Sequence, residues 1–201
     1  MASNLATKPP LMALSLALLV LAVPVVTGCG SSDSGGADAP RPPDYDRKLA
    51  NSPKPLAMLH AEEGALLPGG VDGFQRQVKR LYGFPIVVNI WASWCGPCRE
   101  EFPIFQKVSA AQGREVAFLG VDFDDDRAAA ATFLKSYPVP YPSYLDPDKS
   151  ITDWLRANRG IPATAFFDDR GEQTHVKYGP YRDRAELEAD IDRYARTLPE
   201  L

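Results

Sequence analysis

The pattern of apolar and polar positions predicts a domain in which strands and helices alternate. Short apolar runs rich in β-branched residues indicate buried strands, and apolar residues three or four positions apart indicate helices. The expected strands are 86–91, 115–123, 163–167 and 173–178, with weaker patterns for an edge strand within 56–67 and an extended piece at 143–145. The expected helices are 71–81, 96–111, 126–137, 148–158 and 183–198. This order predicts an α/β fold with a central mixed β-sheet flanked by helices.

The N-terminal segment has the pattern of an export signal. Residues 11–26 are apolar apart from Ser15, are interrupted by Pro24 and follow a single basic residue, Lys8. The apolar run is shorter than the ~20 residues that a membrane-spanning helix needs, so residues 1–28 are predicted to be a signal peptide.

The sequence Val25-Val26-Thr27-Gly28-Cys29 resembles a bacterial lipobox. That resemblance implies cleavage before Cys29, lipidation of Cys29 and a protein anchored at the extracytoplasmic face of the bacterial cell membrane. An uncleaved anchor, or an ordinary signal peptide that gives a secreted or periplasmic protein, stays open as an alternative.

The polar stretch that follows predicts a tether between this anchor and the domain. Residues 29–54 are rich in Gly, Ser, Asp and Pro and contain very few apolar residues, a composition typical of disordered linkers. The folded domain is therefore expected to comprise residues 55–201.

Charge and cysteine content narrow the class of protein. The formal net charge is −4, which gives no indication of a nucleic-acid partner or of binding to an anionic surface. The chain has three cysteines, two of them close together, and this excludes a scaffold held by several disulfides.

The Cys95-Gly96-Pro97-Cys98 motif lies where a predicted strand meets a predicted helix. The N-terminus of a helix favours negative charge, and hence the thiolate of its first cysteine, while Pro97 is well tolerated in the first turn. Two cysteines in this position predict a redox disulfide that exchanges with other disulfides. Cys95 is expected to attack a partner disulfide and Cys98 to resolve the mixed disulfide.

The residues around the motif resemble a known family. Trp94-Cys95-Gly96-Pro97-Cys98 is the signature of the thioredoxin superfamily, and residues 89–103 resemble the TlpA/ResA branch of extracytoplasmic thioredoxin-like proteins. The resemblance covers roughly residues 55–198 and implies a thioredoxin fold. Trp94 is expected to lie beside the site and to shape the surface on which partners dock.

The resemblance also implies a proline opposite the dithiol. Thioredoxin-like proteins place a residue followed by a cis-proline there, which here corresponds to Ile161-Pro162. The Ile161 backbone would then pair with an extended substrate segment. The spacing alone favours an ordinary trans proline at the start of a strand, so the expected cis bond depends on the resemblance.

Glu101 is the third candidate catalytic residue. It follows Cys98 by three positions and so shares its helix face, and it matches a glutamate that TlpA/ResA-type proteins keep near the dithiol. Such a carboxylate would relay the proton of Cys98 and raise the pKa of the thiols. The alternative is a solvated acid in the first turns of a helix. Asn89 stands where the similar cytoplasmic thioredoxin has a buried aspartate, which moves the acid–base role toward Glu101.

The functional hypothesis is a protein-disulfide oxidoreductase that needs no cofactor and reduces cysteines of exported proteins. The resemblance implies work on apocytochromes or copper sites, with electrons from a membrane thiol carrier. Oxidation of substrate thiols uses the same mechanism and stays open, because only the reduction potential sets the direction. A peroxidase is less well supported, since the two cysteines are paired.

Two metal-binding alternatives compete with the redox hypothesis. A copper chaperone would use the soft thiolates, with His175 or Met58 as further ligands. Half of a zinc site is disfavoured, because such a site needs four ligands and only His60, His175 and Cys29 remain as candidates.

Overall fold

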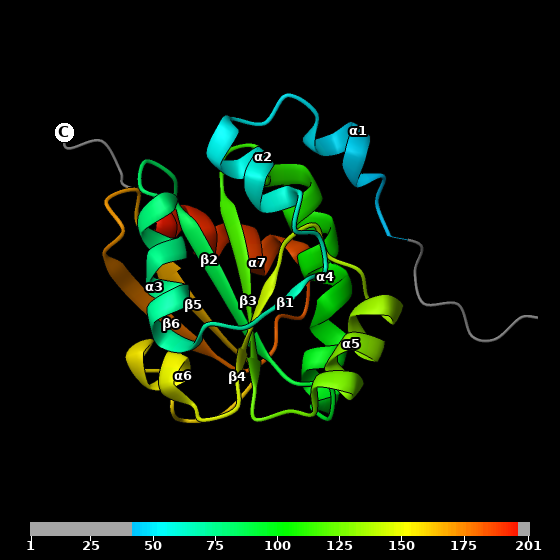
Figure 1. Cartoon of the computed structure of the whole chain (residues 1–201). Coiled ribbons are helices and arrows are strands. Elements are labelled where there is room, and N and C mark those ends of the chain that lie inside the picture. Colours follow the sequence, from blue (N-terminus) through cyan, green and yellow to red (C-terminus); the bar gives the residue numbers. More distant parts are fainter. Residues whose placement is uncertain (1–41, 197–201) are drawn as a thin grey trace, which may run out of the picture. The chain divides into compact units, whose positions relative to one another are not determined.

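The computed structural model describes residues 42–196. These residues form one six-stranded sheet in the order β1-β4-β3-β2-β5-β6 (Figure 1). The first four strands of that order pair in parallel, whereas β5 is antiparallel to both β2 and β6. The strands are β1 (Leu66–Leu67), β2 (Ile86–Trp91), β3 (Ala117–Phe123), β4 (Ser143–Asp146), β5 (Ala163–Phe167) and β6 (Gln173–Tyr178). The predicted mixed sheet is confirmed.

Helices cover both faces of the sheet. In Figure 1, α3 and α6 lie on the near side and α7 lies on the far side. One apolar cluster joins the sheet to α4, α5 and α7, and a second joins it to α2, α3 and α6. The helices are α1 (Tyr45–Leu49), α2 (Lys54–His60), α3 (Gly70–Arg80), α4 (Gly96–Gln112), α5 (Arg127–Ser136), α6 (Ser150–Trp154) and α7 (Arg184–Asp190), followed by a π-helical turn η1 (Ile191–Ala195).

The central strand β2 explains where the cysteine motif lies. All six of its residues are buried, because β3 and β5 flank it and helices cover both of its faces. Val87 and Trp91 belong to the cluster on the α4 side, and Ile86, Val88 and Ile90 to the opposite cluster. The chain leaves β2 at its carboxyl end and enters α4 after the short loop of residues 92–95, so the motif is held at the edge of the sheet.

The predicted tether ends earlier than residue 54, and this part of the prediction is wrong. Residues 45–49 form α1, whose Tyr45 and Leu49 are buried. Asp44 caps the helix by accepting the Arg47 N–H at 3.1 Å, and the Tyr45 hydroxyl donates to the Pro138 carbonyl at 2.8 Å. The folded part therefore starts before residue 55. The buried face of this helix consists of two large side chains four positions apart. The polar residues between and around them made the segment look like a linker in the sequence.

The other differences concern the lengths of elements. The weak pattern at 56–67 contains the expected edge strand β1 but also α2, whose Leu56 and Leu59 are buried. The extended piece at 143–145 is the strand β4, paired on both sides. The last two helices are shorter than predicted, since α6 has five residues and α7 continues into η1. The predicted signal peptide, residues 1–28, and Cys29 lie outside the described residues.

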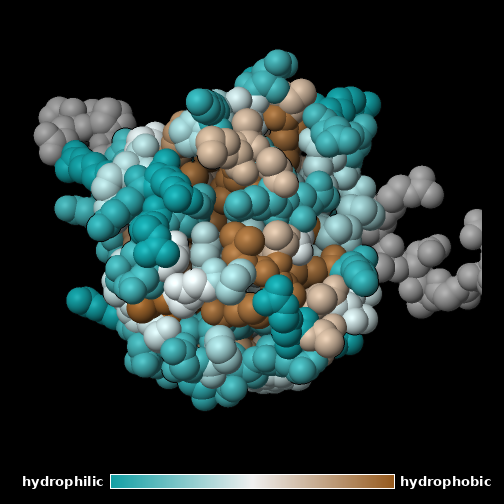
Figure 2. Space-filling view, in the orientation of Figure 1, coloured by the Kyte–Doolittle hydropathy of each residue, from teal (hydrophilic) through white to brown (hydrophobic). Residues whose placement is uncertain are grey.

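The surface of the domain is largely polar. On the face shown in Figure 2, hydrophilic residues surround a central area of apolar surface. Within residues 42–196, no helix combines the length and the apolar character needed to cross a bilayer.

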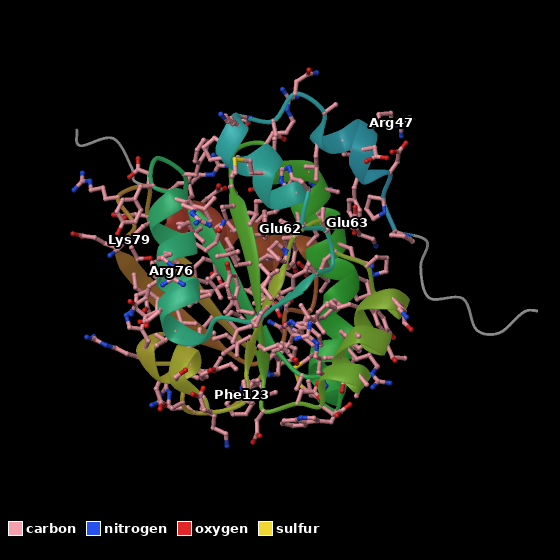
Figure 3. The ribbon with its side chains drawn as sticks, viewed as in Figure 1. Arg47, Glu62, Glu63, Arg76, Lys79 and Phe123 are labelled. Atoms are coloured by element: carbon pink, nitrogen blue, oxygen red, sulfur yellow. A yellow bond between two sulfur atoms is a disulfide. The ribbon has the colours of Figure 1, made fainter. Side chains whose placement is uncertain are left out.

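The structure predicts that α1 contributes to the stability of the domain. Replacing Leu49 with Ala removes most of a side chain that is only 7% exposed, and this should lower the free energy of unfolding by about 2 kcal/mol. Denaturant-induced unfolding measures the change. Arg47→Ala is the matched control, because Arg47 points away from the domain (Figure 3) and its side chain is 77% exposed. Equal stability of the two variants would show that α1 behaves as a tether.

Candidate active site

The two cysteines lie where the loop after β2 enters α4, Cys95 at the end of the loop and Cys98 in the first turn of the helix. Cys95 is the N-cap of α4 and is joined to Cys98 by a disulfide, with the two Cα atoms 5.3 Å apart. Cys95 is 4% exposed to solvent, whereas Cys98 is fully buried. A partner sulfur can therefore approach Cys95 first, which supports its predicted role as the attacking residue and that of Cys98 as the resolving one.

A backbone donor in the first turn of α4 contacts the sulfur of Cys95. The Cys98 N–H donates to the Cys95 Sγ at 3.2 Å, in the way an N-cap side chain accepts from the first turn of a helix. When the disulfide is reduced, the same N–H and the helix dipole would stabilise a thiolate at Cys95.

Ile161-Pro162 lies next to the end of β2. The Ile161–Pro162 peptide bond is cis, as the resemblance implies. Pro162 immediately precedes β5, and its neighbour Ala163 pairs with Ile90 of β2. This register places the proline beside the strand end from which the dithiol loop leaves. The role of Ile161 in binding substrate stays a prediction.

Trp94 and Arg99 are exposed side chains that hold the loop. The indole N–H of Trp94, a residue that is 59% exposed, donates to the Asp124 carbonyl at 3.1 Å. Arg99 donates to the Ser93 carbonyl at 2.7 Å, and its guanidinium carbon lies 5.8 Å from the centre of the Phe133 ring. The docking role of Trp94 stays a prediction.

Glu101 is fully buried, so it is not a solvated acid at a helix start. Its carboxylate accepts the Asn89 Nδ2–H at 2.9 Å and the Tyr181 backbone N–H at 3.2 Å. Burial raises the pKa of this carboxyl from the ordinary value of 4.5 to about 8, although both hydrogen bonds and the charge of Lys177 oppose the rise. Glu101 therefore keeps its proton near neutral pH, one helical turn after Cys98.

Sequence reasoning missed the contacts that bury Glu101. Asn89 was expected to move the acid–base role toward Glu101, but not to donate a hydrogen bond to it. Its position could have been a signal, since it is the one polar residue of β2 and shares a face with Val87 and Trp91. Tyr181 is 80 positions from Glu101, and no local pattern indicates that contact.

A second set of acids near the dithiol was also missed. Asp122 of β3 is 1% exposed, and Asp125 accepts hydrogen bonds from the backbone and side chain of Ser93 in the dithiol loop. The signal in the sequence is an acidic residue inside the apolar run of residues 117–123.

The side chains considered as metal ligands lie in other settings. The His175 ring stacks on Tyr194, with 3.9 Å between ring centres, and Met58 is exposed on α2. Burial lowers the pKa of His60. In the part of the chain that the structure describes, no group of three or more His, Cys, Asp or Glu side chains is placed to hold a metal ion.

Comparison with known proteins identifies the class of this site. Residues 66–191 match the model of the family described as Redoxin. The chain is 36% identical to the thiol:disulfide interchange protein DsbE of Allochromatium vinosum over 153 residues, which cover 73% of this chain and 82% of that protein. It is 30% identical to the thiol-disulfide oxidoreductase ResA of Bacillus subtilis over 111 residues, covering 54% of this chain and 60% of that protein.

A solved structure gives the same result for the fold. MTB dsbF, described in its mixed oxidized and reduced forms, is 32% identical and superimposes with a TM-score of 0.53. The similarity covers 57% of this chain and 84% of that one. Together with the observed sheet order, this confirms the thioredoxin fold.

The buried state of Glu101 predicts a pH dependence of stability. Between about pH 4.5 and 8 the folded protein holds a proton that the unfolded chain has lost, so the free energy of unfolding falls as pH rises through this window. Glu101→Gln removes this contribution. Relative to wild type, the variant should gain on the order of 1 kcal/mol per pH unit across the window.

Urea unfolding of the oxidised protein at several pH values measures this difference without titrating thiols. Glu100→Gln is the matched control, because Glu100 is exposed in the same helical turn. Stability curves of Glu101→Gln and wild type that run parallel from pH 5 to pH 8 would show that Glu101 is not protonated in the folded protein.

Proposed function

The chain belongs to the Redoxin family, and we propose that this disulfide oxidoreductase reduces disulfides of exported proteins outside the cytoplasm. The observation that carries the proposal is the Cys95–Cys98 disulfide at the start of α4, with the buried carboxyl of Glu101 one turn further on.

The reaction of the reduced protein consists of two exchanges. The Cys95 thiolate attacks one sulfur of the substrate disulfide, that S–S bond breaks, and the other substrate sulfur leaves as a thiolate that takes up a proton. Cys98 then loses its proton and attacks the Cys95 sulfur of the mixed disulfide. The second substrate thiolate is released and the Cys95–Cys98 disulfide forms, so two electrons pass to the substrate.

Glu101 is proposed to exchange a proton with Cys98. Three positions separate them on one helix, so they share a face. A carboxyl with a pKa of about 8 is close to the ~8.5 of an unperturbed thiol, and proton transfer between such groups is nearly balanced in energy. In the fraction of molecules in which Glu101 is ionised, its carboxylate accepts the proton as Cys98 attacks. When a donor thiol reopens the disulfide, Glu101 returns the proton to the departing Cys98 sulfur.

The proposed location follows from the N-terminal sequence. The lipobox-like residues that end in Cys29 support a lipid anchor on the extracytoplasmic face of the membrane. A protein held there would meet cysteine-containing exported proteins as substrates and a membrane thiol carrier as electron donor. The resemblance to the TlpA/ResA branch supports cytochrome c maturation as the process served.

A trapping experiment tests the mechanism. The substrate is a peptide that carries an oxidised Cys-x-x-Cys-His motif, the haem-attachment sequence of c-type cytochromes. Reduced Cys98→Ser should form a long-lived mixed disulfide with the peptide through Cys95, because no second thiol resolves it. Cys95→Ser should lose at least about 1,000-fold in rate, as enzymes do when their nucleophile is removed.

Mass spectrometry identifies the trapped complex, and the wild-type protein serves as the control that completes the reaction without accumulating it. Full exchange activity in Cys95→Ser, or a mixed disulfide formed at Cys98 in wild type, would contradict the assigned roles.

A further inference from the structure

Asp122 is a buried carboxyl group to which no group in the described part of the chain donates a hydrogen bond. It lies in β3 one position before Phe123, which marks the lower end of that strand in Figure 3. Neither of its oxygens accepts a hydrogen bond from any donor in the described part of the chain. Trp91, its register partner on β2, directs its indole N–H to Ser143 instead. An ionised carboxylate in such a place is costly, so the group keeps its proton.

The side chain with the strongest electrostatic effect on Asp122 is the carboxyl group of Asp125. Both oxygens of Asp125 act as acceptors: Oδ2 from the Ser93 N–H at 2.5 Å, and Oδ1 from the Ser93 hydroxyl at 2.9 Å and the Asp126 N–H at 2.8 Å. A hydrogen bond between two carboxyl groups needs one proton, and these donors make Asp125 the ionised partner. A proton shared between the two carboxyl groups would therefore sit on Asp122 and point to Asp125.

Asp125 holds the loop before the dithiol through its hydrogen bonds to Ser93. All three polar groups of Ser93 are held, since its carbonyl also accepts from Arg99 at 2.7 Å. The next turn is closed by the Cys95 N–H, which donates to the Ala92 carbonyl at 3.1 Å. Ser93 thus connects the end of β3 to the start of α4, two positions before the attacking cysteine.

We propose that Asp122 and Asp125 share one proton and thereby position residues 92–94, and with them Cys95, and that loss of this proton releases the loop. Asp122 is then a positioning residue, and its effect on catalysis rests on the exchange reaction proposed above. Burial, and then the charges of Asp125, Asp126 and Asp146, raise the pKa of Asp122 to about 8, so the release falls in a range that can be measured.

The surrounding charges make the ionised pair unfavourable. Asp126 caps α5 by accepting two backbone N–H groups, and Asp146 accepts the Ile151 and Thr152 N–H groups at the start of α6. Two cations near the loop have other partners than Asp122. Lys149 pairs with the exposed Asp124 at 2.9 Å, and Arg99 donates to the Ser93 carbonyl. The charges that act on Asp122 within the described residues are those of Asp125, Asp126 and Asp146, and their repulsion of an ionised Asp122 would weaken the Asp125–Ser93 contact.

The test begins with oxidised full-length protein, in which no active-site thiol titrates. Nuclear magnetic resonance follows the Asp122 carboxyl carbon and the Ser93 amide from pH 5 to pH 10. Both signals should move with one common midpoint near 8. A Ser93 amide that does not move, or that moves with a different midpoint from the Asp122 carboxyl, overturns the proposal, and this outcome needs no variant.

Three variants separate the pair from other groups. Asp122→Asn keeps a donor toward Asp125 but cannot ionise, so the Ser93 titration should vanish. Asp125→Asn removes the facing charge, so the midpoint of Asp122 should fall. Glu101→Gln removes the buried carboxyl next to Cys98, whose pKa is also raised, and should leave the Ser93 titration in place. Persistence of the Ser93 titration in Asp122→Asn overturns the proposal.

A kinetic comparison connects the pair to the dithiol. The rate at which a small dithiol reduces the Cys95–Cys98 disulfide is measured for wild type and for Asp122→Asn, and their ratio cancels the ionisation of the reagent. The ratio of the wild-type rate to the variant rate should fall by at least about threefold from pH 6.5 to pH 9.5, because only the wild-type loop is released at high pH. A 1 Å misplacement of a reacting group can cost ~100-fold in rate, so a threefold fall is a modest expectation.

A constant ratio overturns the link between the pair and Cys95. The two proposals can fail separately. If the Ser93 and Asp122 signals titrate together and the rate ratio falls, the positioning pair stands. If the same protein does not exchange protein disulfides, the proposed function fails.

Discussion

The burial of one carboxyl group beside the dithiol is the constraint on which the site depends. Glu101 is enclosed because three distant segments meet over it: α4 supplies the acid, β2 supplies the Asn89 amide, and the turn after β6 supplies the Tyr181 N–H. Each segment is held by the sheet order that places β2 between β3 and β5. Without that packing the carboxyl would be solvated and ionised at neutral pH, and the cysteine motif would have no proton donor behind it.

The site thus combines two protonated acids with different tasks. Glu101 lies one turn after Cys98 and is the proposed proton partner of that buried sulfur, whereas Asp122 is proposed to act at a distance through Asp125 and Ser93 on the loop before Cys95. In both cases the protein removes water from a carboxyl group and supplies too little compensating charge, so the proton stays bound. The same physical device provides a proton for the chemistry and a fixed geometry for the nucleophile.

Local pattern predicted what is encoded locally. The apolar run of β2, the helix that begins at Gly96 and the cysteine pair lie within twenty residues, and their arrangement follows from strand and helix preferences alone. The cis bond before Pro162 came only from the resemblance to thioredoxin-like proteins. The helix α1 was missed because its buried face consists of just Tyr45 and Leu49. The contacts around Glu101 and Asp122 join residues 12 to 80 positions apart, and such contacts depend on the completed fold.

The proposed direction of electron flow is the central claim, and the burial of the dithiol supports it. Cys98 is fully buried and Cys95 is 4% exposed, and burial opposes negative charge on a sulfur. The thiolate of the reduced form therefore gains less stabilisation than in a strong oxidant. The most direct test is the equilibrium reduction potential of the Cys95–Cys98 pair at pH 7. The account predicts a value near or below about −250 mV, in the range of thioredoxin, whereas a value near about −120 mV, like that of the oxidant DsbA, would contradict it.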